Sequence, residues 1–398
     1  MNSNIDFLIV GAGIYGVTIA RLLTDAGYKC LIIDKSPHIG GKCYSIPGDQ
    51  NLYEMHLYGP HIFHTSDVQV AQFITNYVKF NNYKHKVIAN NNGKYYNLPF
   101  NMNTFYSLFK TINPEDAYNK INEEIEEAKE TYKDRDDLEA TANKLVGKTI
   151  YKTLIKEYTE KQWNKKCCDL SGDIIKRLPL RFDYDNHYYN DLFYGVPSNG
   201  YTNMFENIIN GNSFDQKLHL PISYLLNTDY LLSIDYWSNI ANKVIYCGAI
   251  DELLDYKLGE LEWRSLRFEH KEYEYNGHNG QGTSVINYVS SKNKETRSTE
   301  YMYFMKERWQ GKTNFKSIIT TEYPDNYERG KERYYPIESP QNLNLYNKYL
   351  ELLKKEMPNV IMGGRLGKYK YFDMDKAIKE AIDDFTEIIK NDKNISED

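Results

Sequence analysis

Two histidines three residues apart, His61 and His64 in the segment YGPHIFHT, are the first side chains of the sequence that could do chemistry. Histidines at this spacing can bind a metal ion, but a zinc site needs a third and a fourth ligand. No carboxylate or cysteine stands at a suitable nearby spacing, so we expect no metal site. The residues alone leave two alternatives open: a functional role, or a turn with two hydrogen-bonded histidines. Pro60 fixes one φ angle of that turn.

A glycine-rich segment near the N-terminus carries a second chemical signal. The apolar run FLIV leads into Gly11, Gly13 and Gly16, and the apolar residues that follow recur at helical spacing. In a strand–turn–helix unit, the first glycine permits the tight turn, the second lets the backbone approach a diphosphate, and the third lets the helix pack closely. A second apolar run ends at Asp34, which could accept a hydrogen bond from a ribose hydroxyl. The sequence therefore predicts a dinucleotide-binding domain.

A second glycine pair, Gly40-Gly41, indicates which dinucleotide is bound. With Lys42 it extends the phosphate-binding surface, and the segment is similar to the FAD-binding segment of amine oxidases, which usually has arginine at this lysine position. A third pair, Gly363-Gly364, is followed by Arg365, whose guanidinium could bind a diphosphate, although an ordinary strand-to-helix turn is the alternative. The predicted FAD-binding residues are Gly11, Gly13, Gly16, Asp34, Lys35, Gly40, Gly41, Lys42, Gly248, Gly364 and Arg365.

The composition is that of an ordinary globular protein, with 398 residues, 41% of them hydrophobic and 26% charged. A net charge of −6 gives no basic excess, which argues against nucleic acid as a partner. The apolar runs are too short to span a membrane, and no secretory signal is visible. The five cysteines fit neither a zinc nor a disulfide spacing, which indicates a reducing compartment, so we expect a cytoplasmic protein.

The predicted fold class is α/β, with an FAD-binding Rossmann-like domain, an inserted helical domain and an antiparallel β-sheet domain. Within it, a hairpin is expected to turn at Asn92-Gly93, and a helix is expected to begin after Ser66 as its N-cap. The expected FAD-binding domain is discontinuous and comprises residues 1–85, about 205–262 and 345–398. The helical domain spans 104–176, and the sheet domain comprises 86–103, 177–204 and 263–344.

Seven sequence blocks occur in the same order as in one enzyme family. They extend over nearly the whole chain and read YGPHIFHT, NLPFNMNTF, YTEKQW, IIKRLPLRFDYDNHYYND, IYCGAID, ERYYPI and GGRLGKYKYFDM. Together they resemble the bacterial-type UDP-galactopyranose mutases. The resemblance implies an FAD-dependent isomerase that interconverts UDP-galactopyranose and UDP-galactofuranose. In that family the N5 atom of reduced FAD is the nucleophile on the sugar C1, UDP is the leaving group, and there is no net redox change.

The resemblance also assigns residues around the flavin and the substrate. It implies that His61 and His64 line the flavin, with His64 the better placed to bond near the sugar. Arg177 and Arg297 match the two arginines that bind the diphosphate. The match of Arg297 is looser because the segment after it is lengthened, and Arg308 is the nearest alternative. The substrate-binding residues implied are Tyr158, Trp163, Tyr188, Tyr335, Tyr371 and Asp373.

Other functions stay open at this stage. A mutase of the same mechanism acting on an N-acetylated or deoxy nucleotide sugar would share these residues. An amine-oxidase-like flavin oxidoreductase would share only the nucleotide elements, and a non-catalytic FAD-binding scaffold is a third class. Lys368 stands where the family commonly has an acid, so local ion pairing is expected to differ there. The partners expected are a UDP-sugar, an external reductant such as NAD(P)H or reduced flavin, and a second copy of the chain in a homodimer.

Overall fold

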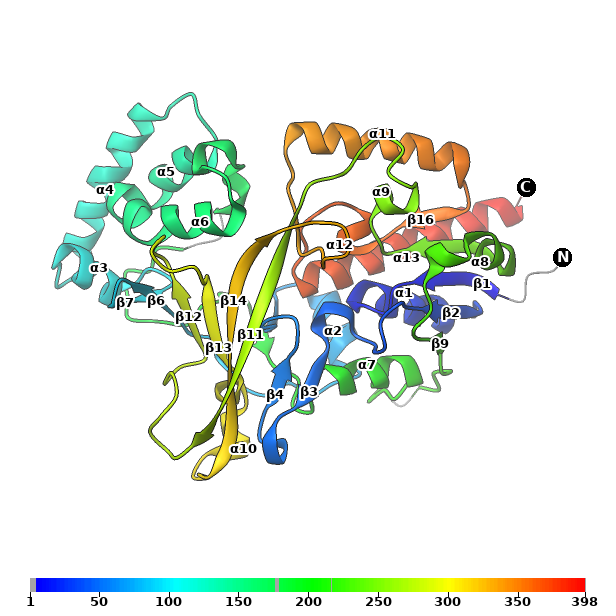
Figure 1. Ribbon diagram of the computed structural model, residues 1–398, viewed down its shortest axis with the longest axis horizontal. Helices are drawn as coiled ribbons and strands as arrows, with labels where there is room; N and C mark the ends of the chain where they lie inside the picture. Colours follow the sequence, from blue (N-terminus) through cyan, green and yellow to red (C-terminus); the bar gives the residue numbers. More distant parts are fainter. Residues whose placement is uncertain (1–4, 176–178, 216, 398) are drawn as a thin grey trace.

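The computed structural model describes residues 5–175, 179–215 and 217–397. It has a parallel sheet with helices at one end and a second, larger sheet beside a group of helices at the other (Figure 1). The long strands β11 (Trp263–Tyr275) and β14 (Phe315–Asn326) lie between the two ends. In the described part of the chain no helix is long and apolar enough to cross a membrane.

The parallel sheet has five strands in the order β16-β10-β1-β2-β9. Their bounds are β1 Ile5–Val10, β2 Cys30–Ile33, β9 Ser223–Leu225, β10 Ala241–Tyr246 and β16 Val360–Met362, and every pairing is parallel. Successive side chains of a strand point to opposite faces. Phe7 and Ile9 accordingly belong to one buried cluster and Leu8 to another, so both faces are covered. This arrangement confirms the predicted Rossmann-like domain.

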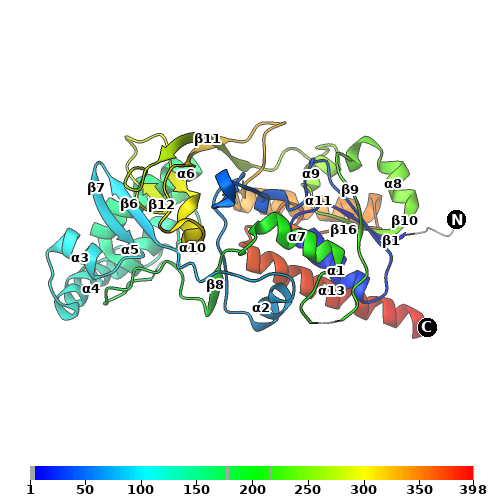
Figure 2. The same cartoon turned by 90° about the horizontal axis from the view of Figure 1, so that it is seen from below.

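Helices cover both faces of the parallel sheet. The first face carries α1 (Ile14–Asp25), α7 (Gly200–Asn210) and α13 (Met374–Glu397), and Figure 2 shows α1 and α13 side by side. The second face carries α8 (Ile234–Ile240), α9 (Ile250–Leu253) and α11 (Pro340–Glu356).

Polar contacts tie α13 to its neighbours. The hydroxyl of Tyr15 on α1 donates to Asp384 at 2.5 Å. Lys368, which follows α12 (Gly364–Gly367), contacts Glu380 at 2.5 Å and Asp384 at 2.7 Å. Two carboxylates on α13 therefore share one lysine, which accounts for a basic residue at a position where an acid is common in the family.

The second sheet has seven strands in the order β15-β11-β14-β13-β12-β6-β7. Besides β11 and β14 it contains β6 Val87–Asn91, β7 Lys94–Leu98, β12 Val285–Tyr288, β13 Arg297–Glu300 and β15 Tyr335–Pro336. All its pairings are antiparallel except β6 with β12, which is parallel. The hairpin predicted at Asn92-Gly93 is present, and both residues have the positive φ angles, 51° and 84°, that a tight two-residue turn needs.

A separate group of helices lies, along the chain, after β6 and β7 and before the other strands of this sheet. It is drawn in cyan and green at the upper left of Figure 1. They are α3 Met102–Phe109, α4 Pro114–Thr131, α5 Leu138–Ile150, a π-helical segment Tyr151–Ile155, and α6 Lys156–Trp163. Two 3-10 turns, Cys167–Asp169 and Gly172–Ile174, follow. These helices fall in the range expected for an inserted helical unit, while the full division into domains stays a prediction.

One detail differs from the sequence-based expectations. Helix α2 (Val68–Thr75) is capped by Asp67, whose carboxylate accepts the Gln69 and Val70 N–H groups, whereas Ser66 donates to Asp191 at 2.8 Å. The described part of segment 177–204 adds no strand to the seven-stranded sheet. Its strand β8 (Phe193–Gly195) pairs instead with β5 (Phe63–Thr65).

The remaining elements are short. Strands β3 (Ser45–Pro47) and β4 (Glu54–His56) form a small antiparallel pair. Helix α10 (Lys306–Trp309) follows a 3-10 segment, Tyr301–Met305, and further 3-10 turns are Gly41–Cys43, Asp49–Asn51 and Tyr230–Leu232.

Candidate functional site

One cavity of about 1520 Å³ lies where the parallel sheet, the seven-stranded sheet and the helical group meet. Of the predicted site residues that the structure describes, all line this cavity. They are Gly11, Gly13, Gly16, Asp34, Lys35, Gly40, Gly41, Lys42, His61, His64, Tyr158, Trp163, Tyr188, Gly248, Arg297, Tyr335, Gly364, Arg365, Tyr371 and Asp373. Arg177 lies outside the described residues. Residues from nine separate parts of the sequence thus converge, although their individual roles stay predictions.

The turn from β1 to α1 forms the first wall of the cavity. Gly11 has a φ angle of 122°, which only glycine adopts readily. Gly13 is the N-cap of α1 and has no side chain to occupy the freed N–H groups; a Cβ built there would meet no atom within 4 Å. A Cβ on Gly16 would instead lie 1.9 Å from the Gly11 carbonyl oxygen. Gly16 therefore serves packing, and Gly13 leaves open space at a helix N-terminus that favours an anion.

Asp34, at the end of β2, is held beside this turn. One carboxylate oxygen accepts the Ala12 N–H at 2.7 Å and the other accepts the Ser36 N–H at 2.7 Å. A carboxylate has about four acceptor positions, so capacity remains for hydroxyl groups of a ligand. The arrangement matches what the glycine-rich turn and its downstream acid predict.

Lys42 also lines the cavity. Gly40 and Gly41, with φ angles of 94° and 53°, turn the chain so that the lysine reaches the cavity. Its ammonium pairs with Glu332 and lies 4.5 Å from the centre of the Tyr334 ring. Burial lowers the pKa of Lys42.

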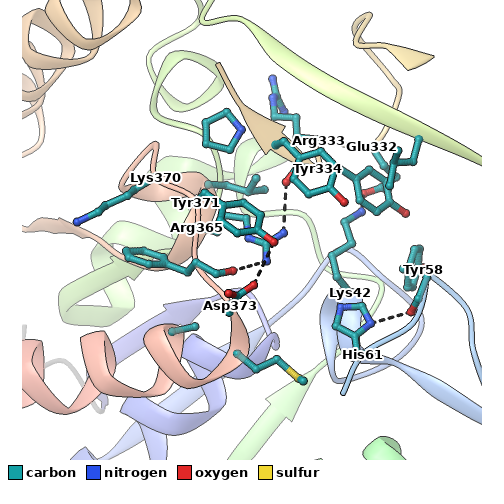
Figure 3. A pocket seen from close by; sticks show the side chains of 18 of the residues that line it. Lys42, Tyr58, His61, Glu332, Arg333, Tyr334, Arg365, Lys370, Tyr371 and Asp373 are labelled. Carbon is teal, nitrogen blue, oxygen red and sulfur yellow. Dashed lines mark hydrogen bonds and ion pairs between the residues drawn. The ribbon is translucent and has the colours of Figure 1, made fainter. Parts of the chain in front are cut away.

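Arg365 holds two segments of the cavity wall together. Its guanidinium donates to the carbonyl oxygen of Tyr334 at 3.3 Å and to that of Phe372, and lies 4.9 Å from the centre of the Tyr371 ring. Figure 3 shows Arg365, Tyr371 and Asp373 on one side of the pocket and Lys42 on the other. The contacts of Arg365 orient the protein itself, so its expected contact with a diphosphate stays a prediction.

His61 is held in the neutral form. Its Nδ1 lies 2.8 Å from the Gly59 carbonyl oxygen, and its backbone N–H donates to Nδ1 of the buried His56 at 3.0 Å. Burial lowers the pKa of His61 to about 4. A carbonyl oxygen only accepts, so Nδ1 of His61 carries the proton and Nε2 is left as an acceptor.

His64 is positioned by two residues of one loop. Its Nδ1 lies 2.8 Å from Oδ2 of Asp191, and its ring stacks on Tyr189 with centroids 3.8 Å apart and planes 16° apart. Both partners line the cavity. Sequence reasoning missed both of them as site residues, although they lie inside a block that carried the family resemblance. The block marked the segment, but the pairing joins residues 127 apart and needed the fold.

Arg297 enters the cavity from β13. Its Nε lies 3.1 Å from Oε2 of Glu322 on β14, a buried carboxylate that the sequence reasoning also missed. Although burial alone lowers the pKa of Arg297, the attraction of Glu322 raises it well above the usual value. Glu322 thus holds the guanidinium at the cavity wall as an ion pair, and Nε of Arg297 makes no hydrogen bond within the described part of the chain.

Arg308, the alternative to Arg297, is used elsewhere. It contacts Glu54 at 3.5 Å and donates to the carbonyl oxygens of Asn51, at 3.2 Å, and of Ser198. It is not among the described residues that line the cavity. Geometry therefore favours Arg297 over Arg308 as the anion-binding residue.

Aromatic side chains form the remaining wall. Helix α6 presents Tyr158 and Trp163, and the Trp163 ring lies 6.0 Å from that of Tyr335, which in turn lies 5.7 Å from that of Tyr371. The Tyr371 hydroxyl donates to Asp373 at 3.0 Å.

Tyr188 lines the same cavity and contacts His85, a second lining residue that the sequence reasoning did not single out. The Tyr188 N–H donates to the His85 carbonyl at 2.8 Å, and the two rings lie 5.5 Å apart. Burial lowers the pKa of His85 to about 3, so it is neutral at physiological pH. No group of three or more potential metal ligands occurs among the residues that the structure describes.

The fold and the cavity define a nucleotide-binding protein of the Rossmann class with a second, anion-binding side to the same pocket. Comparison with known families agrees, since residues 9–77 match the NAD(P)-binding Rossmann-like domain and residues 153–371 match the UDP-galactopyranose mutase model. The chain belongs to the UDP-galactopyranose mutase family. It is therefore an isomerase.

Three known proteins illustrate the relationship. The dTDP-fucopyranose mutase of Escherichia coli is 35% identical over 97% of this chain and 99% of its own length. The UDP-galactopyranose mutase of Mycoplasma genitalium is 33% identical over 96% of this chain and 94% of its own length. A crystal structure of reduced UDP-galactopyranose mutase superimposes with a TM-score of 0.71, covering 97% and 94% of the two chains. At 15% identity the structural match shows the fold alone.

Proposed function

We propose that the protein interconverts UDP-galactopyranose and UDP-galactofuranose with reduced FAD as cofactor. One observation carries the proposal: the dinucleotide cradle at Gly13 and the guanidinium-bearing Arg297 line the same cavity. A nucleotide sugar that binds through its diphosphate can therefore bring its anomeric carbon to a cofactor in that cradle.

The residues present fit a flavin dinucleotide. Gly13 leaves room for a diphosphate at the N-terminus of α1, and Asp34 offers free acceptor positions for ribose hydroxyls. A second helix, α13, begins at the cavity, where Met374 and Ala377 are part of the lining. Reduced flavin supplies a nucleophilic nitrogen that is regenerated in each turnover, so no net electron transfer is needed.

Arg297 stabilises the departing diphosphate. Negative charge grows on the diphosphate as the bond to the sugar breaks, and a guanidinium held by Glu322 is already oriented to receive it. The ion pair fixes Nε and leaves the planar fork for the phosphate oxygens. By resemblance Arg177 binds the same group.

The histidines order the sugar side of the pocket. Asp191 accepts the Nδ1 proton of His64, so Nε2 is the ring nitrogen left to bond a sugar hydroxyl. His61 offers a second such acceptor because its own Nδ1 proton goes to Gly59. The aromatic residues of α6, Tyr158 and Trp163, provide flat surfaces against which a pyrimidine base can pack.

The test uses the purified protein with bound FAD and UDP-galactofuranose. We expect conversion to UDP-galactopyranose after dithionite reduction, with no reductant consumed per turnover, and little conversion by strictly oxidised protein. Chromatography of the nucleotide sugars measures both. Equal rates in the two redox states would overturn the proposed role of reduced flavin.

A related nucleotide sugar is the second candidate. The 35% identity to a dTDP-fucopyranose mutase extends over nearly the whole chain and is no lower than the 33% identity to the UDP-galactopyranose mutase described above. Assaying the reduced enzyme with UDP-galactose, UDP-N-acetylgalactosamine and dTDP-fucose, each as pyranose, ranks them by kcat/KM.

We further propose that the protein is a homodimer, which light scattering would check. We also propose that its flavin receives electrons from NAD(P)H or free reduced flavin, which anaerobic reduction spectra would check.

A further inference from the structure

Lys161, on α6, binds a neighbouring loop through its ammonium group. Its Nζ lies 2.8 Å from the carbonyl oxygen of Tyr288, 3.0 Å from that of Ser290, 3.1 Å from that of Asn293 and 2.6 Å from that of Glu295. An ammonium has three N–H groups, so four carbonyl oxygens share three donors. The side chain occupies the place that a small bound cation would take in such a loop.

Glu157, one helical turn earlier, binds the same loop. Its carboxylate accepts the Ser291 N–H at 2.6 Å and faces the Ser290 hydroxyl at 3.4 Å. Residues four apart lie on one face of a helix. Helix α6 therefore holds the loop with the face of Glu157 and Lys161 and presents Tyr158 and Trp163 to the cavity.

The loop leads directly to Arg297. It connects β12 to β13, which begins at Arg297, and its ends are fixed by the Tyr288 N–H donating to Thr296 and the Thr296 N–H donating to Glu322, both at 2.9 Å. Shifting the four carbonyl oxygens would shift the start of β13. Lys161 thus connects α6, which carries the aromatic wall, to the loop that leads into β13 at Arg297.

The free-energy cost of burying the Lys161 ammonium indicates that its contacts with the loop have a structural role. Lys161 is partly buried, and burial lowers its pKa to about 8. Burying an ammonium opposes folding unless its donors are satisfied. The donors of Lys161 are satisfied by backbone carbonyl oxygens rather than by a directly bonded carboxylate. The ammonium group therefore holds the backbone of the loop in one conformation.

We propose that Lys161 is a positioning residue that fixes Arg297 relative to Tyr158 and Trp163, so that the diphosphate and the base of one substrate are bound together. The proposal rests on the function proposed above. It assigns Lys161 no contact with the substrate, and it predicts that the effect of Lys161 on nucleotide binding passes through Arg297.

The experiment measures UDP affinity of the FAD-loaded protein by calorimetry in a double-mutant cycle. Lys161→Met keeps an unbranched apolar side chain close to the length of the lysine stem and removes its donors, and we expect UDP binding to weaken about tenfold or more. In an Arg297→Ala background the same change should weaken binding by less than about threefold, because coupled residues are not additive. Equal effects in both backgrounds would overturn the proposal.

Two further variants separate positioning from general stability. Glu157→Gln loosens the Ser291 side of the loop alone and should weaken UDP binding in the same direction, again only when Arg297 is present. Lys148→Met removes a lysine of α5 that pairs with Glu127 at 2.8 Å on the surface, and it should leave UDP binding unchanged. A comparable loss in Lys148→Met would show that any change in the helical group matters, and would count against a specific role.

Hydrogen exchange tests the role of Lys161 with a measurement that does not depend on the proposed activity. Amides of the loop from Ser290 to Thr296 should exchange faster in Lys161→Met than in the unchanged protein, with or without UDP. Faster exchange with unchanged UDP affinity would reject the positioning role. If the unchanged protein binds UDP but isomerises none of the sugars tested, the proposed function fails while the cycle still decides the role of Lys161.

Discussion

Nδ1 of His64 and Oδ2 of Asp191 lie 2.8 Å apart, although the two residues are separated by 127 positions in the chain. Strand β5, which contains His64, pairs with β8, which begins two residues after Asp191, so the contact is part of a local antiparallel arrangement. An ionised carboxylate only accepts, so this contact places a proton on Nδ1 of the ring.

Asp191→Asn tests this relationship. The amide can donate to the ring and favour the other tautomer, so we expect kcat of the reduced enzyme to fall about tenfold or more with a smaller change in KM. Steady-state assays with UDP-galactofuranose measure both constants. Ser66→Ala removes a hydroxyl that donates to the other oxygen of Asp191 at 2.8 Å, and should have the lesser effect. An unchanged kcat in Asp191→Asn would mean that the His64 tautomer does not limit turnover.

Arg297→Ala and Arg308→Ala form a matched pair. Removing Arg297 deletes charge-assisted hydrogen bonds to the diphosphate, each worth roughly 1.5–3 kcal/mol, so kcat/KM should fall about tenfold to several hundredfold. Arg297→Lys should recover part of the loss because it keeps the charge without the fork. Arg308→Ala should lower the thermal midpoint instead, since it releases Asn51, Ser198 and Glu54. The reverse pattern would place the anion site at Arg308.

Gly13→Val and Gly16→Val should fail in different ways. Gly13 has an extended backbone, φ −78° and ψ −177°, and open space beside it, so valine fits the folded protein and fills the cradle. We expect folded but colourless protein, judged by circular dichroism and flavin absorbance. A Cβ at Gly16 would overlap the Gly11 carbonyl at 1.9 Å, so that variant should be insoluble or unfolded. A yellow Gly13→Val protein would contradict binding at this turn.

Acid should destabilise the protein through His61. Its pKa is lowered from the usual 6.5 to about 4 by burial, so between these values the unfolded state binds a proton that the folded state does not. Stability attributable to this residue is complete above pH 6.5 and is lost as the pH falls toward 4. Thermal midpoints measured across this range should decline less steeply in His61→Asn than in the unchanged protein. Parallel curves would show that His61 titrates normally.

The local parts of the fold could be predicted from the sequence, and the long-range parts of the site could not. The β1–Gly11–α1 turn and the Asn92-Gly93 hairpin follow from backbone requirements of neighbouring residues. The partners Asp191 and Glu322 come from distant segments, and no local pattern specifies them. Helix α2 shows the limit of local reasoning, because Ser66 and Asp67 are both good caps and only the bond from Ser66 to Asp191 decides between them.

Lys161 was equally invisible to patterning. In the block YTEKQW it looks like one more charge on an exposed helix face. Its four carbonyl partners lie more than 120 residues later, in a loop with no apolar periodicity. Every residue type has a backbone carbonyl oxygen, so the residue types of the loop do not indicate that a side chain of another segment binds there.

The order of strands in the parallel sheet has a consequence for biosynthesis. The central strands β1 and β2 emerge early from the ribosome, but β10 follows after residue 240, and its outer neighbour β16 ends at residue 362 of 398. Pairings between such distant segments form slowly, and a nascent chain exposes unpaired strand edges meanwhile. Since Gly364, Asp373 and α13 complete the cavity wall, a growing chain has no finished cavity until these segments have been made. A chain that stops before α13 should thus lack a complete cavity and be prone to aggregation.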